Sequence, residues 1–192
     1  MILRLAALLV WVAGACAADD LSVEATRRGG AVEVRARATI EAPFGVVWET
    51  LTDYNRLAEF IPGMHRSRIL EWRGNEAIVE QVGEARFLFF TFPIEVTVGS
   101  ASRPPNAIDV RVLKGNLKQL NGGYRIEPAG EGRILLRWIG LVEPEMLLPP
   151  LLGEAVMRSN IEDQFTGMVR EIERREALRR GRAPSEGKEG RQ

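Results

Sequence analysis

The 192-residue chain is poor in the side chains that most enzymes and metal sites require. It holds one histidine, His65, and one cysteine, Cys16. A catalytic triad would have to use His65, and a zinc site would depend on carboxylates. Neither common glycine-rich phosphate loop is present. We therefore expect no catalytic residue, no metal ligand and no cofactor, and we interpret His65 as a partly exposed loop residue.

The chain also lacks an excess of charge of either sign. Lys+Arg and Asp+Glu both number 26, so the formal net charge is +0. Nucleic-acid-binding proteins usually carry a basic bias, so we expect no nucleic-acid partner. Apolar residues make up 45% of the chain, which is ordinary for a globular protein. The length suits one domain with a substantial core.

The apolar run near the N-terminus is shorter than the roughly 20 residues that a membrane-spanning helix needs. Residues 1–17 instead match an export signal, with a positive start at Met1–Arg4, an apolar run at Leu5–Val12 and small residues at Ala13–Ala18. We predict that this segment is cleaved and that the protein is exported, to the periplasm. The alternative is a lipid anchor on Cys16, because AGAC loosely resembles a lipoprotein processing site.

Period-two patterns predict an antiparallel sheet. From Ala31 to Ile40, apolar and polar residues alternate strictly. Turn signals such as Arg73-Gly74-Asn75 separate further apolar segments at hairpin spacing. The residues before this region, 18–30, are expected to form a flexible leader or a weak edge strand. The further expected strands are 68–72, 77–82, 87–98, 108–113, 123–126 and 133–142.

Helical periodicity predicts two short helices and one long one. Pro43 suits the first turn of a short helix, and a polar elbow at Asp53–Asn55 separates it from a second piece that ends at Pro62-Gly63. We expect the Asp53 side chain to cap the second piece. A long amphipathic helix is expected from Leu151 to Arg180, with an apolar stripe formed by Met157, Ile161, Phe165, Met168 and Ile172.

These elements predict an α+β fold. A curved antiparallel sheet of about seven strands would pack on the long C-terminal helix, with two short helices after the first strand. The domain would span residues 31–180, and residues 181–192 would form a flexible tail. The elbow would close one end of a cavity between the sheet and the long helix while letting one wall move.

The stretch Ala38–Glu71 resembles the START-like helix-grip (SRPBCC) superfamily, and most closely its coenzyme Q-binding and polyketide cyclase/dehydrase branch. The motifs that carry the resemblance are Ala42-Pro43, Val47-Trp48, Leu51-Thr52-Asp53-Tyr54 and Phe60-Ile61-Pro62. The resemblance covers most of Val32–Leu178, and its first third is the specific part. It implies a sheet that grips the C-terminal helix around an apolar cavity. Members bind sterols, phospholipids, quinones, polyketides or other hydrophobic molecules, and some are enzymes.

We therefore expect a protein that binds, and transports or presents, a hydrophobic small molecule or lipid. The expected cavity-lining residues are mainly apolar side chains on the inward faces: Trp48, Tyr54, Phe60, Phe90, Phe92, Met157, Ile161, Phe165 and Met168. Tyr54 has two interpretations, since it could pack with its hydroxyl paired inside the protein or contact the ligand directly.

Two other classes of function stay open. A cyclase or dehydrase would need Tyr54 or a carboxylate in the cavity, although alternation places Glu80 and Glu84 on the solvent face; Glu95 is the third candidate carboxylate. An interaction module would use the segment Phe87–Pro93, whose alternating aromatic sets cannot share one face, or the leucine-rich segment Met146–Leu152. The latter segment could also touch a membrane transiently. The oligomeric state is not predicted.

Overall fold

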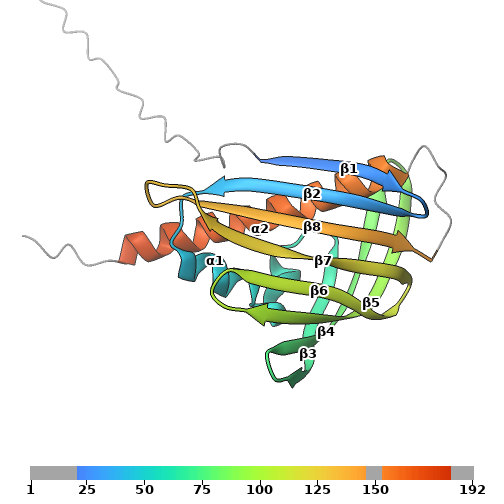
Figure 1. Ribbon diagram of the computed structural model, residues 1–192, viewed down its shortest axis with the longest axis horizontal. Coiled ribbons are helices and arrows are strands. Elements are labelled where there is room, and N and C mark those ends of the chain that lie inside the picture. The colour runs from blue at the N-terminus through green and yellow to red at the C-terminus, as the bar shows by residue number, and fades with distance from the viewer. Residues whose placement is uncertain (1–20, 146–152, 183–192) are drawn as a thin grey trace, which may run out of the picture.

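The computed structural model describes residues 21–145 and 153–182 (Figure 1). The chain forms an antiparallel sheet, two short helical segments and one long helix, which confirms the predicted α+β class. The elements in chain order are β1 Ser22–Arg28, β2 Ala31–Ile40, α1 Phe44–Leu51, the 3₁₀ helix η1 Tyr54–Glu59, β3 Met64–Arg73, β4 Glu76–Phe87, β5 Phe90–Arg103, β6 Ala107–Gly115, β7 Leu117–Pro128, β8 Ile134–Pro144 and α2 Gly153–Arg182.

The eight strands form one sheet in the order β1-β2-β8-β7-β6-β5-β4-β3. All neighbours are antiparallel, and the sheet curves so that α2 lies behind β1, β2 and β8 in Figure 1. Strands β3 and β4 cross behind the front strands at a steep angle (Figure 1). The sheet therefore wraps around one long helix, as the helix-grip resemblance implies.

The sheet order explains the two short helical segments. Strands β2 and β3 follow each other in the chain but are separated in the sheet by the other five later strands. The chain must therefore cross the open end of the curved sheet, and α1 and η1 make that crossing. Leu51, Tyr54 and Leu57 from this segment are buried in the common core. The elbow is thus part of the wall that joins the two halves of the sheet.

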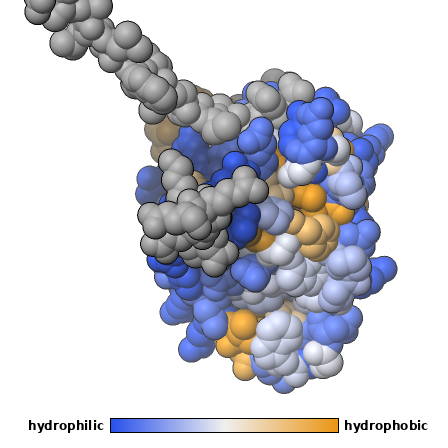
Figure 2. All heavy atoms as spheres, turned by 90° about the vertical axis from the view of Figure 1, so that its left-hand side faces the viewer, coloured by the Kyte–Doolittle hydropathy of each residue, from blue (hydrophilic) through white to orange (hydrophobic). Residues whose placement is uncertain are grey.

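The apolar stripe of α2 faces the sheet as predicted. Phe165, Met168 and Ile172 are buried in the core, and Ile161 is packed against it. The end of the molecule at which α2 terminates is largely hydrophilic, with smaller apolar patches (Figure 2). Among the described residues, no helix is both long enough and apolar enough to cross a membrane.

Strand β1 decides between the two expectations for the residues before Ala31, because residues 22–28 form an edge strand and not a flexible leader. Residues Ser22–Arg28 pair along their whole length with β2 through the turn at Gly29-Gly30. Val23 is the one buried residue of this strand, which is why alternation alone gave a weak signal. The two short helical segments consequently follow the second strand and not the first.

Two other expectations are corrected, and three lie outside the described residues. The expected strand 87–98 contains a hairpin turn at Leu88-Phe89, so its first residue belongs to β4 and the rest to β5. Residues 181–182 belong to α2 and not to a flexible tail. The export signal at 1–17, the segment Met146–Leu152 and the remaining tail at 183–192 lie outside the described residues.

One glycine sets how closely α2 approaches the elbow. A Cβ atom at Gly167 would lie 2.5 Å from Pro62 Cδ and 2.6 Å from the carbonyl oxygen of Phe60. The backbone oxygen cannot move aside as a flexible side chain would. The residue at position 167 must therefore lack a Cβ for α2 to sit at its observed distance.

We expect Gly167→Ala to lower the free energy of unfolding. The overpacking cost of about 1–3 kcal/mol should exceed the gain of up to about 1 kcal/mol in helix propensity. Gly45→Ala in α1 is the matched control, because nothing lies within 4 Å of its added Cβ. Urea denaturation should show Gly45→Ala at or above wild-type stability. Equal stabilisation by both changes would contradict the close approach.

Candidate ligand-binding cavity

A cavity of about 230 Å³ lies between the concave face of the sheet and the first half of α2. Its wall is mostly aliphatic and aromatic, and every element except β1 and β2 contributes to it. The segment that crosses from β2 to β3 contributes Leu51, Tyr54, Leu57 and Ile61, so α1, the elbow and η1 together form part of the cavity wall. Beyond these, the sheet contributes, among others, Ile94, Val96, Val98, Ile108, Val110, Leu117, Leu120, Tyr124, Trp138 and Val142.

Five of the nine residues expected in the wall are found there. Tyr54 lies at the elbow, and α2 contributes the residues that face the sheet, Met157, Ile161, Phe165 and Met168. Their contact with a ligand stays a prediction. The helical period predicted these positions because residues spaced three or four apart lie on one face of α2, and that face is turned towards the sheet.

Trp48 and Phe60 lie elsewhere. Trp48 is partly buried beside the core and stacks on Phe44, with ring centroids 6.4 Å apart. The ring of Phe60 lies under the guanidinium of Arg175, whose carbon is 5.5 Å from the ring centroid. Both aromatic residues therefore fasten the crossing segment, which is a structural contact that the sequence pattern could not separate from cavity lining.

Phe90 and Phe92 lie beyond the end of the cavity. They have the same parity in β5 as the lining residues Ile94, Val96 and Val98, so their expected side of the sheet is consistent with the strand. The wall, however, begins at Ile94, and the hairpin continues past it. A strand longer than the cavity explains why parity alone did not locate these two rings.

The cavity wall contains a buried pair of hydroxyl groups. Tyr54 Oη and Ser100 Oγ are 2.8 Å apart and share a hydrogen bond inside the protein. Tyr124 lines the same cavity, and burial together with the nearby Tyr54 raises the pKa of Tyr124 to about 12. The Tyr124 phenol is therefore neutral at physiological pH. Tyr54 meets the packing interpretation, since its hydroxyl is paired, while its ring still forms part of the wall.

Glu84 is the one candidate carboxylate that reaches the cavity wall. Its side chain is 16% exposed, its carboxylate forms an ion pair with Arg86, and Oε1 lies 3.7 Å from His65 Nε2. Oε1 is buried and is the oxygen that pairs with Arg86, although this contact lacks the geometry of a hydrogen bond. The expectation that Glu84 lies on the solvent face is therefore wrong.

The reason is a local irregularity between β3 and β4. The pairing register shifts between Met64 and Arg66, opposite Gly83 and Val82. A Cβ at Gly83 would lie 2.3 Å from the carbonyl oxygen of Gly63, so the two strands come very close here. The extra residue of this bulge, His65, lies in β3, and β4 keeps its regular pairing with β5. The close approach of β3 leaves the Glu84 side chain half-buried beside His65. His65 itself is exposed, as expected, although it belongs to β3.

The other two carboxylates considered for catalysis are placed differently. Glu80 lies 3.3 Å from Arg66 and 3.2 Å from Arg68 in ion pairs along β3 and β4. Glu95 is exposed. Neither residue belongs to the cavity wall. Among the described residues, no group of three or more His, Cys, Asp or Glu side chains could hold a metal ion.

An ionic cluster joins the elbow to α2. Asp53 does not cap η1 through its side chain, which corrects the expectation; its Oδ2 accepts a 2.8 Å hydrogen bond from the guanidinium of Arg175. Arg175 also donates to Glu171, as does Arg174. Hydrogen bonds from Arg174 and then Arg175 outweigh burial and lower the pKa of Glu171 to about 2. The crossing segment is therefore tied to α2 by charge-assisted bonds.

Comparison with known families places the chain. A family model described as polyketide cyclase / dehydrase and lipid transport matches residues 40–169. The chain belongs to this family. The match spans α1, the elbow, β3 to β8 and the half of α2 that lines the cavity. A search of the curated proteins found no match to the sequence.

Solved structures of other proteins have the same fold as this chain. The Zhui aromatase/cyclase from Streptomyces sp. R1128 matches with a TM-score of 0.65 at 19% identity, over 80% of this chain and 97% of the other. A STAR-related lipid transfer protein fragment from Xanthomonas axonopodis gives 0.58 at 15%, over 80% and 99%. The lipid transfer and protein localization domain of human StarD13 (DLC2) gives 0.62 at 14%, over 82% and 87%. At these identities the likeness establishes the fold and leaves the ligand open.

The low pKa of Glu171 makes a prediction about pH. Because the folded-state pKa lies near 2, below the ordinary value of 4.5, the stabilisation from this carboxylate is present above about pH 4.5 and is lost as the pH falls toward 2. Glu171→Gln should therefore be less stable than wild type at pH 7, and this difference should narrow between pH 4.5 and pH 2.

The measurement is chemical denaturation of both proteins across that pH range. Glu162→Gln is the matched control on the same helix, because Glu162 forms a 3.8 Å ion pair with Arg158 in which both side chains are largely exposed. Such pairs contribute little, so the control should stay close to wild type at every pH. A Glu171→Gln difference that does not change with pH would contradict the assigned ionic cluster.

Proposed function

We propose that this protein binds a compact, uncharged, mainly hydrophobic molecule in the cavity between α2 and the sheet, and carries or presents it. The observation that carries the proposal is the wall itself. It is largely apolar, and no lysine or arginine of the described chain belongs to it. Burying apolar ligand surface supplies the affinity, at roughly 25 cal/mol per Å² before ordering costs.

The size of the cavity limits the ligand. Its volume of about 230 Å³ is below the roughly 300–1,000 Å³ of most small-molecule pockets. A compact molecule, or one segment of a longer chain, fits this space better than a large lipid enclosed whole. The structurally similar lipid transfer proteins and aromatase/cyclase support a hydrophobic ligand without fixing its type.

The polar groups in the wall limit the ligand further. Asn160, Gln164 and Gln81 line the cavity and offer neutral donors and acceptors, and the neutral phenol of Tyr124 adds another. No lysine or arginine of the described chain lines the wall, and the Glu84 carboxylate is already paired with Arg86, so a buried ligand charge would find no free opposite charge and would be costly. Hydroxyl or carbonyl groups on the ligand would instead find hydrogen-bonding partners. The proposed ligand class is therefore a neutral amphiphile with a short polar end.

We place this activity in an exported protein, in the periplasm. The support is the pattern of residues 1–17, with a positive start, a short apolar run and a small-residue exit. Lipid attachment at Cys16 would keep the protein in the same compartment but at a membrane. Sequencing the N-terminus of the protein isolated from its host distinguishes cleavage after residue 17 from a lipidated Cys16.

The test of ligand binding is native mass spectrometry of the protein isolated from its own host, followed by organic extraction. We expect a bound mass that solvent releases. Leu120→Trp should fill the cavity, since Leu120 is a half-buried wall residue, and should reduce the occupied fraction at least roughly ten-fold.

Ile139→Trp is the matched control on the other face of the sheet, where the wild-type side chain is 44% exposed. This variant should keep the bound mass. Circular dichroism checks that both variants are folded. Full occupancy in Leu120→Trp, or an empty wild-type protein, would contradict binding in this cavity.

A cyclase- or dehydrase-like activity is the second candidate, and Glu84 is the observation that favours it. A carboxylate in the wall of an apolar cavity can exchange a proton with a bound molecule when its ion pair with Arg86 opens. The carrier proposal predicts that the extracted ligand is recovered unchanged after incubation with wild type and with Glu84→Gln. Liquid chromatography with mass detection would show conversion. Conversion by wild type that Glu84→Gln abolishes would establish the enzyme instead.

A further inference from the structure

The tip of the β4–β5 hairpin is an exposed apolar cluster that the cavity does not use. We define the hairpin tip as Phe87–Phe90, with Leu88 and Phe89 in the turn. Leu88 is 77% exposed, Phe89 84% and Phe90 43%. The rings of Phe89 and Phe90 are in contact, with centroids 4.4 Å apart. Large apolar side chains gathered at a protruding turn indicate a surface that is covered by something else.

The hairpin tip stands at one end of the cavity. Glu84, Ala85 and Ile94 of the same two strands belong to the cavity wall, and Glu84 precedes Phe87 by three positions. The last wall residue of β4, Ala85, precedes Phe87 by two positions, so at about 3.3 Å per residue the wall ends roughly 7 Å from the tip. Whatever covers the tip is therefore close to the route by which a hydrophobic ligand would enter from that end.

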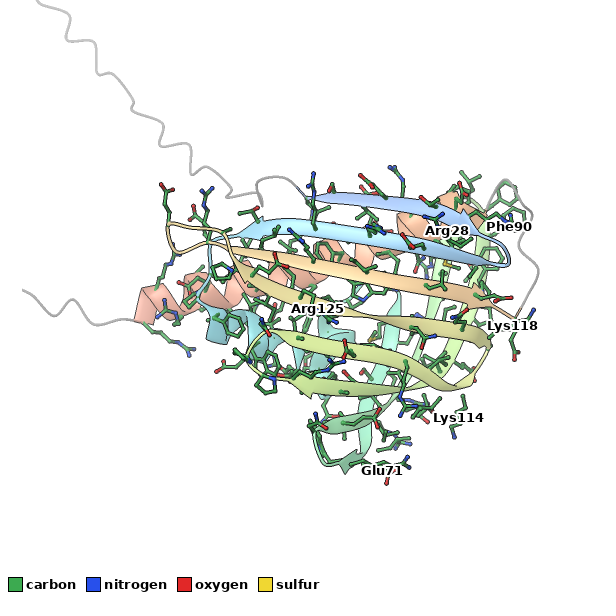
Figure 3. All side chains as sticks on the ribbon, in the orientation of Figure 1. Arg28, Glu71, Phe90, Lys114, Lys118 and Arg125 are labelled. Atoms are coloured by element: carbon green, nitrogen blue, oxygen red, sulfur yellow. The ribbon has the colours of Figure 1, made fainter. Side chains whose placement is uncertain are left out.

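Cationic side chains lie at the same end of the molecule. Figure 3 shows Arg28, Lys114 and Lys118 on the side where Phe90 projects, and Arg86 directly precedes the tip. All four are exposed, and Lys114 makes no ion pair among the described residues. The other three have acidic partners, Glu33, Glu143 and Glu84. The local charge is thus mixed, with long cations able to reach outward.

The exposed area of the tip is small for a protein partner. Two phenylalanines and one leucine at these exposures present roughly 400 Å², about half of the roughly 800 Å² per partner in a stable protein interface. A second copy of the chain, docked tip to tip, would therefore bury too little. A bilayer surface demands no complementary shape, and Phe and Leu are typical of the apolar faces that insert at the membrane interface.

We propose that the hairpin tip docks on the surface of a lipid bilayer, with Leu88 and Phe89 inserted among the headgroups. Docking itself stands on the exposed residues of the tip. Its consequence, that a ligand passes between the membrane and the cavity at this end, rests on the proposed function. Because the surrounding charges are mixed, apolar insertion and not anionic-lipid attraction provides most of the binding.

The test is flotation of the chain, as its host processes it, with phosphatidylcholine vesicles. Leu88→Ser/Phe89→Ser should lower the bound fraction roughly ten-fold relative to wild type. The matched control is Leu113→Ser/Ile139→Ser, which removes exposed apolar side chains from other strands. The control should stay within about two-fold of wild type. Equal binding of the tip and control variants would overturn the proposal.

A second experiment tests docking with an apolar side chain kept at the tip, so that a misfolded variant is not mistaken for a variant that has lost binding. Phe89→Trp keeps an aromatic side chain at the turn, so it should bind vesicles, and brominated lipids should quench its added emission. Ile139→Trp should show no such quenching. Unquenched emission from Phe89→Trp would overturn the proposal. So would sedimentation experiments in which the wild-type protein self-associates through the tip, the tip variant does not, and neither binds vesicles, since the tip would then dock on a second copy of the chain.

The outcome is separable from that of the cavity. Leu120→Trp, which fills the cavity, should float with vesicles as wild type does. If it floats normally while the wild-type protein carries no ligand, docking holds and the proposed function fails. If the wild-type protein carries a ligand and the tip variant still floats normally, the proposed function holds and docking through the tip fails.

Discussion

The fold depends on the burial of one face of α2 in the concave side of the sheet. An antiparallel sheet with one apolar face needs a cover, and α2 supplies it for strands that belong to both halves of the sheet. The second half of the helix fills that space with Val169 and Ile172. The first half leaves a cavity beneath Met157 and Ile161. A single element thus holds the core together and provides one side of the candidate binding site.

The crossing segment divides the molecule into a fastened end and a cavity end. At the fastened end, Gly167 lets α2 touch the segment near Phe60, and Arg175 bonds both Asp53 and Glu171. The first contact is a close approach to the backbone, and the other two are charge-assisted hydrogen bonds. Along the first half of α2, apolar side chains form the cavity wall and leave the cavity between them. Protein interiors normally contain few voids of this size. Keeping that space open therefore depends on how firmly the other end is fixed.

Much of this architecture could be predicted from the sequence because the relevant patterns are local. The stripe of α2 and the alternation of β2 each repeat over many residues, so the inward faces were assigned correctly. Features that depend on a single contact were not accessible. Glu84 is half-buried beside the close approach of β3 to Gly83, and Asp53 bonds an arginine on a distant helix instead of its own helix end. The turn at Leu88 was hidden because a run of aromatic residues resembles an uninterrupted strand.

The pairing of β2 with β8 has a consequence for when the protein can fold. Val34 lies opposite Gly140, so two neighbours in the finished sheet are separated by more than half of the chain. The helix that covers the sheet follows later still. This pairing forms more slowly than the hairpins of the sheet, because the entropy of closing a long loop must be overcome first. A nascent chain that lacks β8 and α2 has β1 as a partner of β2, but it lacks the strand that joins β2 to the rest of the sheet and the helix that covers the sheet. It would stay unfolded until synthesis is nearly complete, the condition in which a polypeptide can be threaded across a membrane.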